Sequence, residues 1–207
     1  MDIYLATSSD NKLRELAVIA NRIFKAMRIL SPKSVGGMPD VEEGEASFEE
    51  NAGLKARALK AKLPKEAWVL ADDSGLEVYC LKGRPGALSA RYAGPGASFE
   101  ENNAKLLTDL EGMVKNRRAA RFVCCLVLIG PSGKEHVFKG GCEGAISIEP
   151  RGQGGFGYDP VFIPEPYDRT FAELGTDIKN KISHRADAVK DMIYWLRFVQ
   201  PAFGAGV

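Results

Sequence analysis

No apolar stretch of the chain approaches the roughly 20 residues that a membrane-spanning helix requires. The first residues, Met1-Asp2-Ile3-Tyr4, lack the basic segment and cleavage site of a signal peptide. The 4 cysteines include no Cys-x-x-Cys pair, and three of them lie in the apolar or strand-like surroundings typical of buried thiols. We therefore expect a cytoplasmic protein that contacts no membrane and uses no cysteine for metal binding or redox chemistry.

The chain also has no excess charge of either sign. Its 28 lysines and arginines against 27 aspartates and glutamates give a formal net charge of +1. Such a protein does not attract DNA or RNA by its overall field, so we expect no nucleic-acid partner, although a local cluster of cations can still bind a small polyanion. The 207 residues are 45% hydrophobic and contain no long linker, so we predict one domain over residues 1–207.

The order of the predicted elements indicates an α/β fold. Apolar runs predict strands at 3–6, 68–71, 76–79 and 120–129, followed by shorter strands at 135–139 and 144–148. The 3.6-residue period of apolar residues predicts helices over 13–24, from Ser47 until Pro64 ends it, over 98–110 and over 189–199. Helices alternate with strands in the first half and strands pair as hairpins later, so the sheet should be mixed.

The pentapeptide Ser-Phe-Glu-Glu-Asn occurs twice, at residues 47–51 and 98–102. In both copies the serine and the second glutamate have the spacing of a capping box, which starts a helix. The flanking sequences diverge quickly, so independent use of the same helix start is favoured over an internal duplication.

The segment Trp68-Val69-Leu70-Ala71-Asp72-Asp73-Ser74-Gly75 is the most informative stretch of the chain. We expect Asp72 and Asp73 to emerge where a buried strand leaves the core, which is where open α/β sheets build ligand sites. Successive side chains of a strand point to opposite sides, so one carboxylate is placed to hold a divalent cation or accept a proton. The alternative is an Asp-Asp-Ser-Gly turn, because all these residue types favour turns.

Three further polar clusters have both a functional and a structural interpretation. The loop from Thr7 to Lys12 lies between a strand and a helix and suits phosphate, or simply caps the helix. Asn51 and Lys55 lie one turn apart on the face of their helix away from its apolar stripe, where a lysine usually only contacts solvent. The acidic residues Asp40, Glu42, Glu43 and Glu45 offer oxygen ligands for Mg²⁺, or form a solvated loop.

The glycine-rich segment 152–160 is unsuited to a regular element. The glycines let the backbone approach a ligand, and the rings of Phe156 and Tyr158 offer faces to a planar base. The alternative is a structural turn whose aromatic residues belong to the core. Lys179 and Ser183-His184-Arg185 gather hydrogen-bond donors just before the last helix, with Arg185 suited to a carbonyl-bearing edge or a phosphate. His184 has the alternative of an ordinary surface histidine.

Five blocks of sequence together point to a known family. They are Ser47 to Ala52, Ala71 to Leu76, Pro85-Gly86 with Ser89 to Tyr92, Gly154 to Pro160, and Ser183 to Arg185. With these five blocks in this order, the chain resembles the inosine triphosphate pyrophosphatases, also called dITP/XTP pyrophosphatases, which remove non-standard purine nucleotides. The resemblance implies a two-lobed α/β fold on a long mixed β-sheet flanked by helices, with the active-site cleft between the lobes, and a homodimer.

The resemblance also implies an activity and a set of site residues. The activity is Mg²⁺-dependent hydrolysis of a nucleoside triphosphate (ITP, dITP or XTP) to the monophosphate and pyrophosphate. By position, Glu42 and Asp73 would bind the metal, with Asp73 also the catalytic proton acceptor. Phosphates would contact Lys55 and the loop residues Thr7, Ser8, Ser9, Asp10, Asn11 and Lys12. The remaining substrate contacts would come from Ser74, Phe156, Gly157, Tyr158, Asp159, Lys179, His184 and Arg185.

One residue departs from the family's pattern, and two other functions stay open. Ser9 stands where the family usually has an asparagine, and since a serine still donates to an oxyanion we expect altered affinity rather than lost activity. A Maf-like pyrophosphatase acting on dTTP, UTP or modified pyrimidines shares the general architecture, but the blocks at 156–159 and 183–185 argue against it. A nucleotide sensor without catalysis is the third hypothesis, and the Asp72-Asp73 pair argues against it because a binder of polyanions gains nothing from added negative charge.

Overall fold

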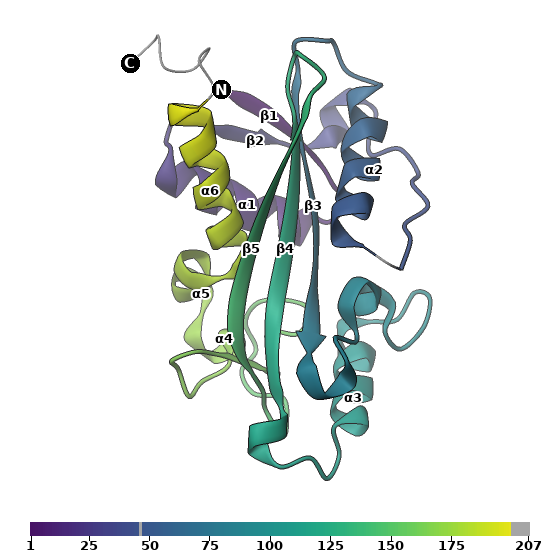
Figure 1. Cartoon of the computed structure of the whole chain (residues 1–207), viewed down its shortest axis with the longest axis vertical. Helices are drawn as coiled ribbons and strands as arrows, with labels where there is room; N and C mark the ends of the chain where they lie inside the picture. Colours follow the sequence, from purple (N-terminus) through teal and green to yellow (C-terminus); the bar gives the residue numbers. More distant parts are fainter. Residues whose placement is uncertain (46, 200–207) are drawn as a thin grey trace. The chain divides into compact units, whose positions relative to one another are not determined.

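The computed structural model describes residues 1–45 and 47–199 and contains a six-stranded sheet with helices around it (Figure 1). The strands are β1 (Asp2–Ala6), β2 (Arg28–Leu30), β3 (Trp68–Val78), β4 (Ala119–Ile129), β5 (Glu135–Ile146) and β6 (Phe162–Pro164). The α-helices are α1 (Asp10–Ile23), α2 (Phe48–Lys60), α3 (Phe99–Asp109), α4 (Phe171–Leu174), α5 (Thr176–Ile182) and α6 (His184–Phe198). Among the residues described, no helix combines the length and apolar character needed to cross a membrane.

The sheet is mixed, as the sequence predicts. Its strand order is β2-β1-β3-β4-β5-β6. Strand β1 runs parallel to both β2 and β3, and β5 runs antiparallel to β6. The α/β class and the mixed sheet are therefore confirmed.

The chain divides into two compact units that we call the first and the second unit. The first unit contains β1, β2, α1, α2 and α6, and the second contains α3, β6, α4 and α5. The three long strands contribute to both, because the chain passes from one unit to the other at residues 73–74, 123–124 and 140–141, and again at 184–185.

The helices begin where hydrogen-bonding serines stand. Ser9 caps α1 by accepting a hydrogen bond from the backbone N–H of Lys12 at 3.3 Å. Ser47 and Ser98 do the same for α2 and α3, so both copies of the repeated pentapeptide start a helix. In α3 the Glu101 side chain also accepts from the Ser98 N–H, which completes the capping box.

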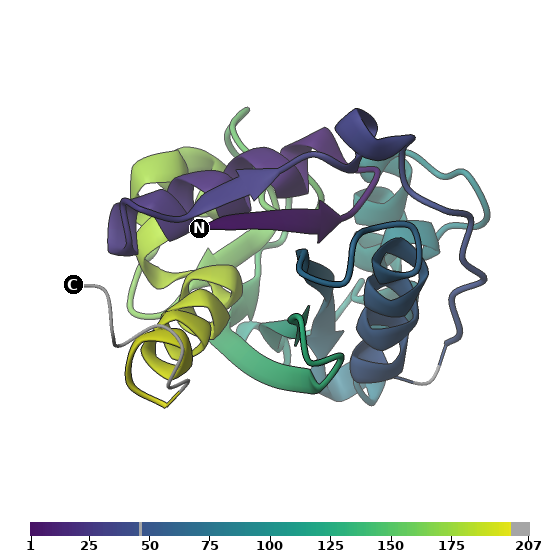
Figure 2. The same ribbon diagram turned by 90° about the horizontal axis from the view of Figure 1, so that it is seen from above.

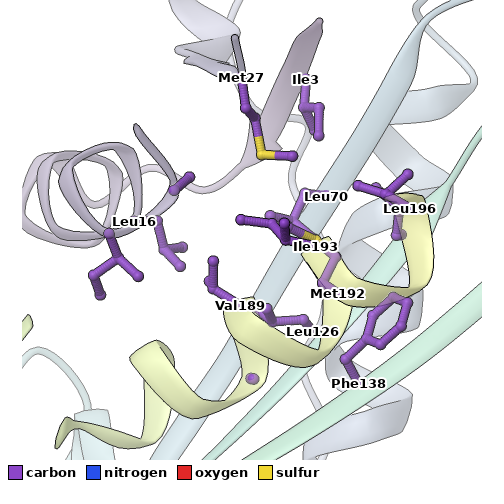
Figure 3. Packing of buried hydrophobic residues seen from close by; sticks show 14 of the residues in the cluster. Ile3, Leu16, Met27, Leu70, Leu126, Phe138, Val189, Met192, Ile193 and Leu196 are labelled. Atoms are coloured by element: carbon purple, nitrogen blue, oxygen red, sulfur yellow. The ribbon is translucent and has the colours of Figure 1, made fainter. Parts of the chain in front are cut away.

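Consecutive residues of β3 serve two apolar clusters of the first unit. Leu70 packs with α1 and α6, in a cluster whose members include Leu126, Leu16 and Val189 (Figure 3). Val69 and Ala71 belong to the other cluster, which includes Ala52, Ala56 and Leu59 of α2. Figure 2 shows α2 and α6 on opposite sides of the strands. The period of two along a strand therefore places Val69 and Ala71 with α2 and Leu70 with α1 and α6.

The core of the second unit is rich in aromatic rings. The ring of Phe122 on β4 lies 4.6 Å from that of Phe162 on β6 and 6.2 Å from that of Phe171 on α4, measured between centroids. Leu106 and Leu110 pack into the same cluster from α3 and its C-terminal cap.

Several details of the predicted elements are wrong. The last helix begins at His184, so His184 and Arg185 lie in α6 and not before it. Strand β3 does not end at Ala71, and Asp72-Asp73-Ser74-Gly75 forms no turn; all four residues lie inside one strand. The strand predicted at 144–148 is the end of β5, α2 ends before Pro64, and β2 and β6 were not predicted. The reason is the same for β3 and the short strands: pairing with distant strands and partners overrides local turn preference.

Leu126→Ala tests the packing of the first unit. The side chain is fully buried on β4, so its truncation should lower the free energy of unfolding by about 2–5 kcal/mol through lost burial and a residual cavity. Val18→Ala on the exposed side of α1 is the control and should change stability by less than about 0.5 kcal/mol. Chemical denaturation of both variants measures the difference, and equal losses would contradict this account of the core.

Candidate active site

Asp73 on β3 is held by two side chains of α2. Its Oδ1 accepts a hydrogen bond from Lys55 Nζ at 2.8 Å, and its Oδ2 accepts one from Asn51 Nδ2 at 3.2 Å. Lys55 Nζ also pairs with Glu43 Oε2 at 2.8 Å. The Lys55 ammonium therefore bridges two carboxylates, one from β3 and one from the acidic segment before α2.

Burial and charge act in opposite directions on this pair. Burial is the largest influence on Asp73 and raises the pKa of its carboxyl above the ordinary value, although Lys55 and Lys12 act to lower it. Burial acts to lower the pKa of Lys55, but Asp73 and Glu43 outweigh burial and raise it. Lys55 is therefore firmly cationic, and the carboxylate form of Asp73 depends on the cations beside it.

Asp72 faces a different set of partners. Its Oδ2 lies 3.2 Å from Lys12 Nζ and accepts a hydrogen bond from Arg185 Nε at 3.2 Å. Its Oδ1 accepts a hydrogen bond from the Cys124 thiol at 3.4 Å. Arg185 Nη1 also lies 3.5 Å from Glu15 Oε1. Burial acts to lower the pKa of Arg185, but the carboxylates of Asp72 and Glu15 outweigh burial and raise that pKa above its ordinary value.

The alternation of β3 explains why the two aspartates have separate partners. Ala71 and Asp73 point toward α2, whereas Leu70 and Asp72 point toward α1 and α6. The expectation that the two carboxylates face opposite sides is confirmed, and tertiary contacts now distinguish them. Asp72 is enclosed by cationic and thiol groups, while Asp73 shares its lysine with a half-exposed glutamate, the more accessible arrangement for a ligand.

The loop from Thr7 to Lys12 shows the capping role that the sequence left open. Ser9 caps α1, and Thr7 Oγ1 accepts a hydrogen bond from the Ser9 N–H at 3.1 Å. Asp10 is exposed and pairs with Lys33 at 2.8 Å, and Ser8 is exposed. Within this loop, Lys12 is the residue whose side chain reaches Asp72. A phosphate role for the loop stays a prediction, and the N-terminus of the 14-residue helix α1 suits it.

The glycine-rich segment of the second unit is organised by Asp159. Its Oδ2 accepts hydrogen bonds from Lys179 Nζ at 2.6 Å and from the Phe156 N–H at 2.9 Å. Lys179 Nζ in turn lies 4.3 Å from the centroid of the Phe156 ring. Gly155 has a φ of +77°, and a Cβ there would overlap Asp159 Oδ2, so this position requires glycine. Lys179 and Phe156 are thus fixed beside each other by one carboxylate.

The remaining predicted substrate contacts of the second unit differ in burial. Tyr158 is buried, its hydroxyl donates to the Ser89 carbonyl at 2.9 Å, and burial raises its pKa; the Phe156 ring is only half-buried. The Gly157 carbonyl accepts a hydrogen bond from Asn103 Nδ2 at 3.0 Å. The His184 ring is buried and stacks on Phe122 with centroids 4.7 Å apart. Ser74 is half-buried on β3.

The model of the Ham1 family matches residues 3–195 of the chain. The chain belongs to the Ham1 family. A curated relative from Opitutus terrae, named dITP/XTP pyrophosphatase, is 47% identical over 201 residues, which cover 95% of this chain and 99% of the relative. A relative of the same name from Halalkalibacterium halodurans is 42% identical over 193 residues, which cover 93% of this chain and 97% of the relative.

Solved structures agree with the fold of this Ham1 family protein. The Ham1 protein of Staphylococcus aureus is 39% identical and matches with a TM-score of 0.81. The match covers 95% of this chain and 98% of that structure. A HAM1 protein from Coxiella burnetii is 36% identical with a TM-score of 0.80, over 93% of this chain and 96% of that structure. The resemblance inferred from the five sequence blocks is therefore confirmed.

The carboxylates around Lys55 fit a hard divalent cation. Within residues 1–45 and 47–199 no group of three or more His, Cys, Asp and Glu side chains is arranged to hold a metal ion. Mg²⁺ does not require such a group, since it typically takes one or two protein carboxylates and completes its shell with water and substrate phosphate. Asp73 and Glu43, which already share one cation in Lys55, satisfy this condition.

Sequence reasoning named Glu43 only as one member of the acidic cluster at 40–45, and it did not identify Glu15 or Cys124 as site residues. Glu43 stands beside the predicted ligand Glu42, which is exposed on the same segment, and nothing in the local sequence indicates which of the two reaches Lys55. Glu15 contacts Arg185 and Cys124 contacts Asp72, and both pairs lie far apart in the sequence, so no spacing rule could have identified them.

Asp73→Asn tests the electrostatic account of this site by its effect on stability. Because the folded-state pKa of Asp73 is raised above 3.8, the folded protein binds this proton more tightly than the unfolded chain, and ionisation of Asp73 costs stability as the pH rises through the folded pKa. Lys55 stays protonated throughout this range, so its lost partner shifts the variant's stability by a constant amount, and the stability of the variant relative to the parent should rise as the pH rises from 3.8. Urea unfolding across pH in the presence of EDTA measures this, with the exposed Asp191→Asn as control. A relative stability that falls as the pH rises would show that the Lys55 pair outweighs burial.

Proposed function

We propose that the protein is a Mg²⁺-dependent nucleoside triphosphate pyrophosphatase that hydrolyses ITP, dITP and XTP to the monophosphate and pyrophosphate. The observation that carries the proposal is the Asp73 carboxylate, held by Lys55 and Asn51 with Glu43 on the same lysine. The names of the curated relatives, dITP/XTP pyrophosphatase, support the substrate class.

The first unit would supply the hydrolytic chemistry. Asp73 and Glu42, with Glu43 as a further candidate, would hold Mg²⁺, which when bound offsets negative charge on the pyrophosphate. Asp73 would accept a proton as water attacks the α-phosphorus; the bond from that phosphorus to the bridging oxygen breaks, and pyrophosphate leaves. Lys55 favours the ionised form of Asp73 that this step requires. Phosphate oxygens would contact Lys55 and the loop residues Thr7, Ser8, Ser9, Asp10, Asn11 and Lys12.

The second unit would recognise the base. Phe156 offers a half-buried ring for stacking, and Lys179 is a buried donor held beside it by Asp159. Donors aimed at a 6-oxo group accept inosine and xanthosine, whereas the amino group of adenine leaves them unpaired at a cost of roughly 1–3 kcal/mol each. The other proposed substrate contacts are Ser74, Gly157, Tyr158, His184 and, from the first unit, Arg185.

Two further expectations belong to this proposal. We propose a homodimer, on the resemblance alone. We also propose a cytoplasmic location, which is supported by the four cysteines, Cys80, Cys124, Cys125 and Cys142, because they are thiols and not disulfides in the described structure.

Pyrophosphate release by Asp73→Asn is the decisive test of the function. With Mg²⁺, the parent should release pyrophosphate from ITP and XTP faster than from ATP, GTP or dTTP, and the variant should lose at least a factor of about 100 in kcat because its amide cannot accept the proton. Asp191→Asn is the matched control and should retain activity. Preference for dTTP would favour a Maf-like enzyme, and tight ITP binding by the parent without turnover would favour a sensor.

Phe156→Ala tests the proposed base site. Loss of a stacking partner worth roughly 1–3 kcal/mol should raise KM for ITP about tenfold. Tyr194→Ala, which removes an exposed ring of α6, should leave KM unchanged. Steady-state kinetics on ITP compares the two, and an unchanged KM in Phe156→Ala would remove this ring from the base site.

A further inference from the structure

The repeated pentapeptide ends in an asparagine whose amide, in both copies, accepts from one backbone N–H and donates to one backbone carbonyl of a nearby loop. Asn51 Oδ1 accepts a hydrogen bond from the Gly44 N–H at 2.8 Å, and its Nδ2 donates to the Gly44 carbonyl at 3.1 Å. Asn102 Oδ1 accepts from the Ala93 N–H at 2.8 Å, and its Nδ2 donates to the Ala90 carbonyl at 3.2 Å. Each asparagine is buried on its helix and fastens the backbone of a neighbouring loop with two hydrogen bonds.

Asn51 differs from Asn102 by one contact. The second N–H of its amide donates to Asp73 Oδ2 at 3.2 Å. The amide orientation is settled by its partners, because one atom must accept from an N–H while the other donates to a carbonyl and a carboxylate. All three bonds of Asn51 are therefore directed, and they join the acidic segment to the proposed catalytic carboxylate.

Asn51 and Lys55, one turn apart on α2, form two parallel bridges between the same elements. Lys55 joins Glu43 to Asp73 Oδ1, and Asn51 joins Gly44, the next residue, to Asp73 Oδ2. The Lys55 bridge consists of ion pairs, and a divalent cation bound by these carboxylates competes with the ammonium for their oxygens. The Asn51 bridge is neutral: two of its bonds end on the Gly44 backbone, which carries no charge for a cation to compete for, and the third ends on Asp73 Oδ2.

We infer that Asn51 is a positioning residue that keeps Glu43 beside Asp73. The inference rests on the proposed function for its catalytic consequence, but not for the bridge itself. The bridge also does not depend on the glycine: a Cβ at Gly44 would lie 3.7 Å from Asn51 Oδ1, an ordinary contact. Gly44→Ala should therefore leave the bridge intact.

The chain offers a matched pair of variants, Asn51→Ala and Asn102→Ala. Both remove the same amide from the same pentapeptide at the start of a helix, so both should lower the melting temperature. Exchange of individual amide hydrogens, followed by NMR without metal or substrate, tests the bridge directly. The Gly44 amide should exchange at least tenfold faster in Asn51→Ala and at the parent's rate in Asn102→Ala, where the Ala93 amide should lose protection instead. If Asn51→Ala does not fold, Asn51→Ser and Asn102→Ser replace the pair.

The positioning role is tested on the same proteins with Mn²⁺ and with ITP. Titration with Mn²⁺ alone should show at least fivefold weaker binding to Asn51→Ala, and kcat/KM for ITP at fixed Mg²⁺ should fall at least tenfold. Asn102→Ala and Gly44→Ala should stay within twofold of the parent in both measurements.

Three other outcomes would contradict three separate parts of the inference. Equal exchange of the Gly44 amide in the parent and Asn51→Ala would overturn the bridge. Faster exchange with unchanged Mn²⁺ affinity and kcat/KM would overturn the positioning role. A parent that neither binds Mn²⁺ nor releases pyrophosphate would overturn the proposed function and, with it, the catalytic consequence assigned to Asn51.

Discussion

Compensation of two buried carboxylates at consecutive positions of β3 is the constraint around which the first unit is arranged. A charge removed from water without a partner costs several kcal/mol, and Asp72 and Asp73 are both buried. Because they point to opposite faces of the strand, the two carboxylates form their ion pairs with different cations. Lys55 reaches Asp73 from α2, while Lys12 and Arg185 reach Asp72 from α1 and α6. The helices that supply these cations, α1, α2 and α6, are also the helices whose apolar residues pack in the two clusters of the first unit.

Local compensation also explains how a protein with a net charge of +1 can be proposed to bind a triphosphate. Two of its buried lysines are paired with carboxylates at defined places, Lys55 with Asp73 and Lys179 with Asp159. A paired lysine is oriented in advance, so a ligand that replaces or joins its partner meets a donor already in position. In the second unit the same carboxylate that holds Lys179 also holds the backbone of Phe156, so the proposed donor and the proposed stacking ring are fixed together.

The elements that the sequence predicts well are those whose signals lie within a few residues. Ser9, Ser47 and Ser98 start their helices because each side chain bonds a backbone N–H three residues ahead. Residues 68–71 form an apolar run whose side chains alternate between the two faces of β3, and Asp72 and Asp73 continue this alternation. The length of β3 is not predicted by local sequence, because Asp-Asp-Ser-Gly favours a turn. Cations from distant helices compensate the two carboxylates and so allow these residues to be extended and buried.

By itself, the sequence determined the α/β class, the starts of α2 and α3, the mixed sheet and, through five ordered blocks, the family. Only the tertiary structure decided which aspartate faces α2, that Glu43 shares Lys55 with it, and that the two copies of one pentapeptide fasten two different loops. The physical reason is range. Helix caps and periodicity act over three or four residues, whereas the contacts that distinguish the carboxylates join residues 22 positions apart for Asn51 with Asp73 and 113 apart for Asp72 with Arg185.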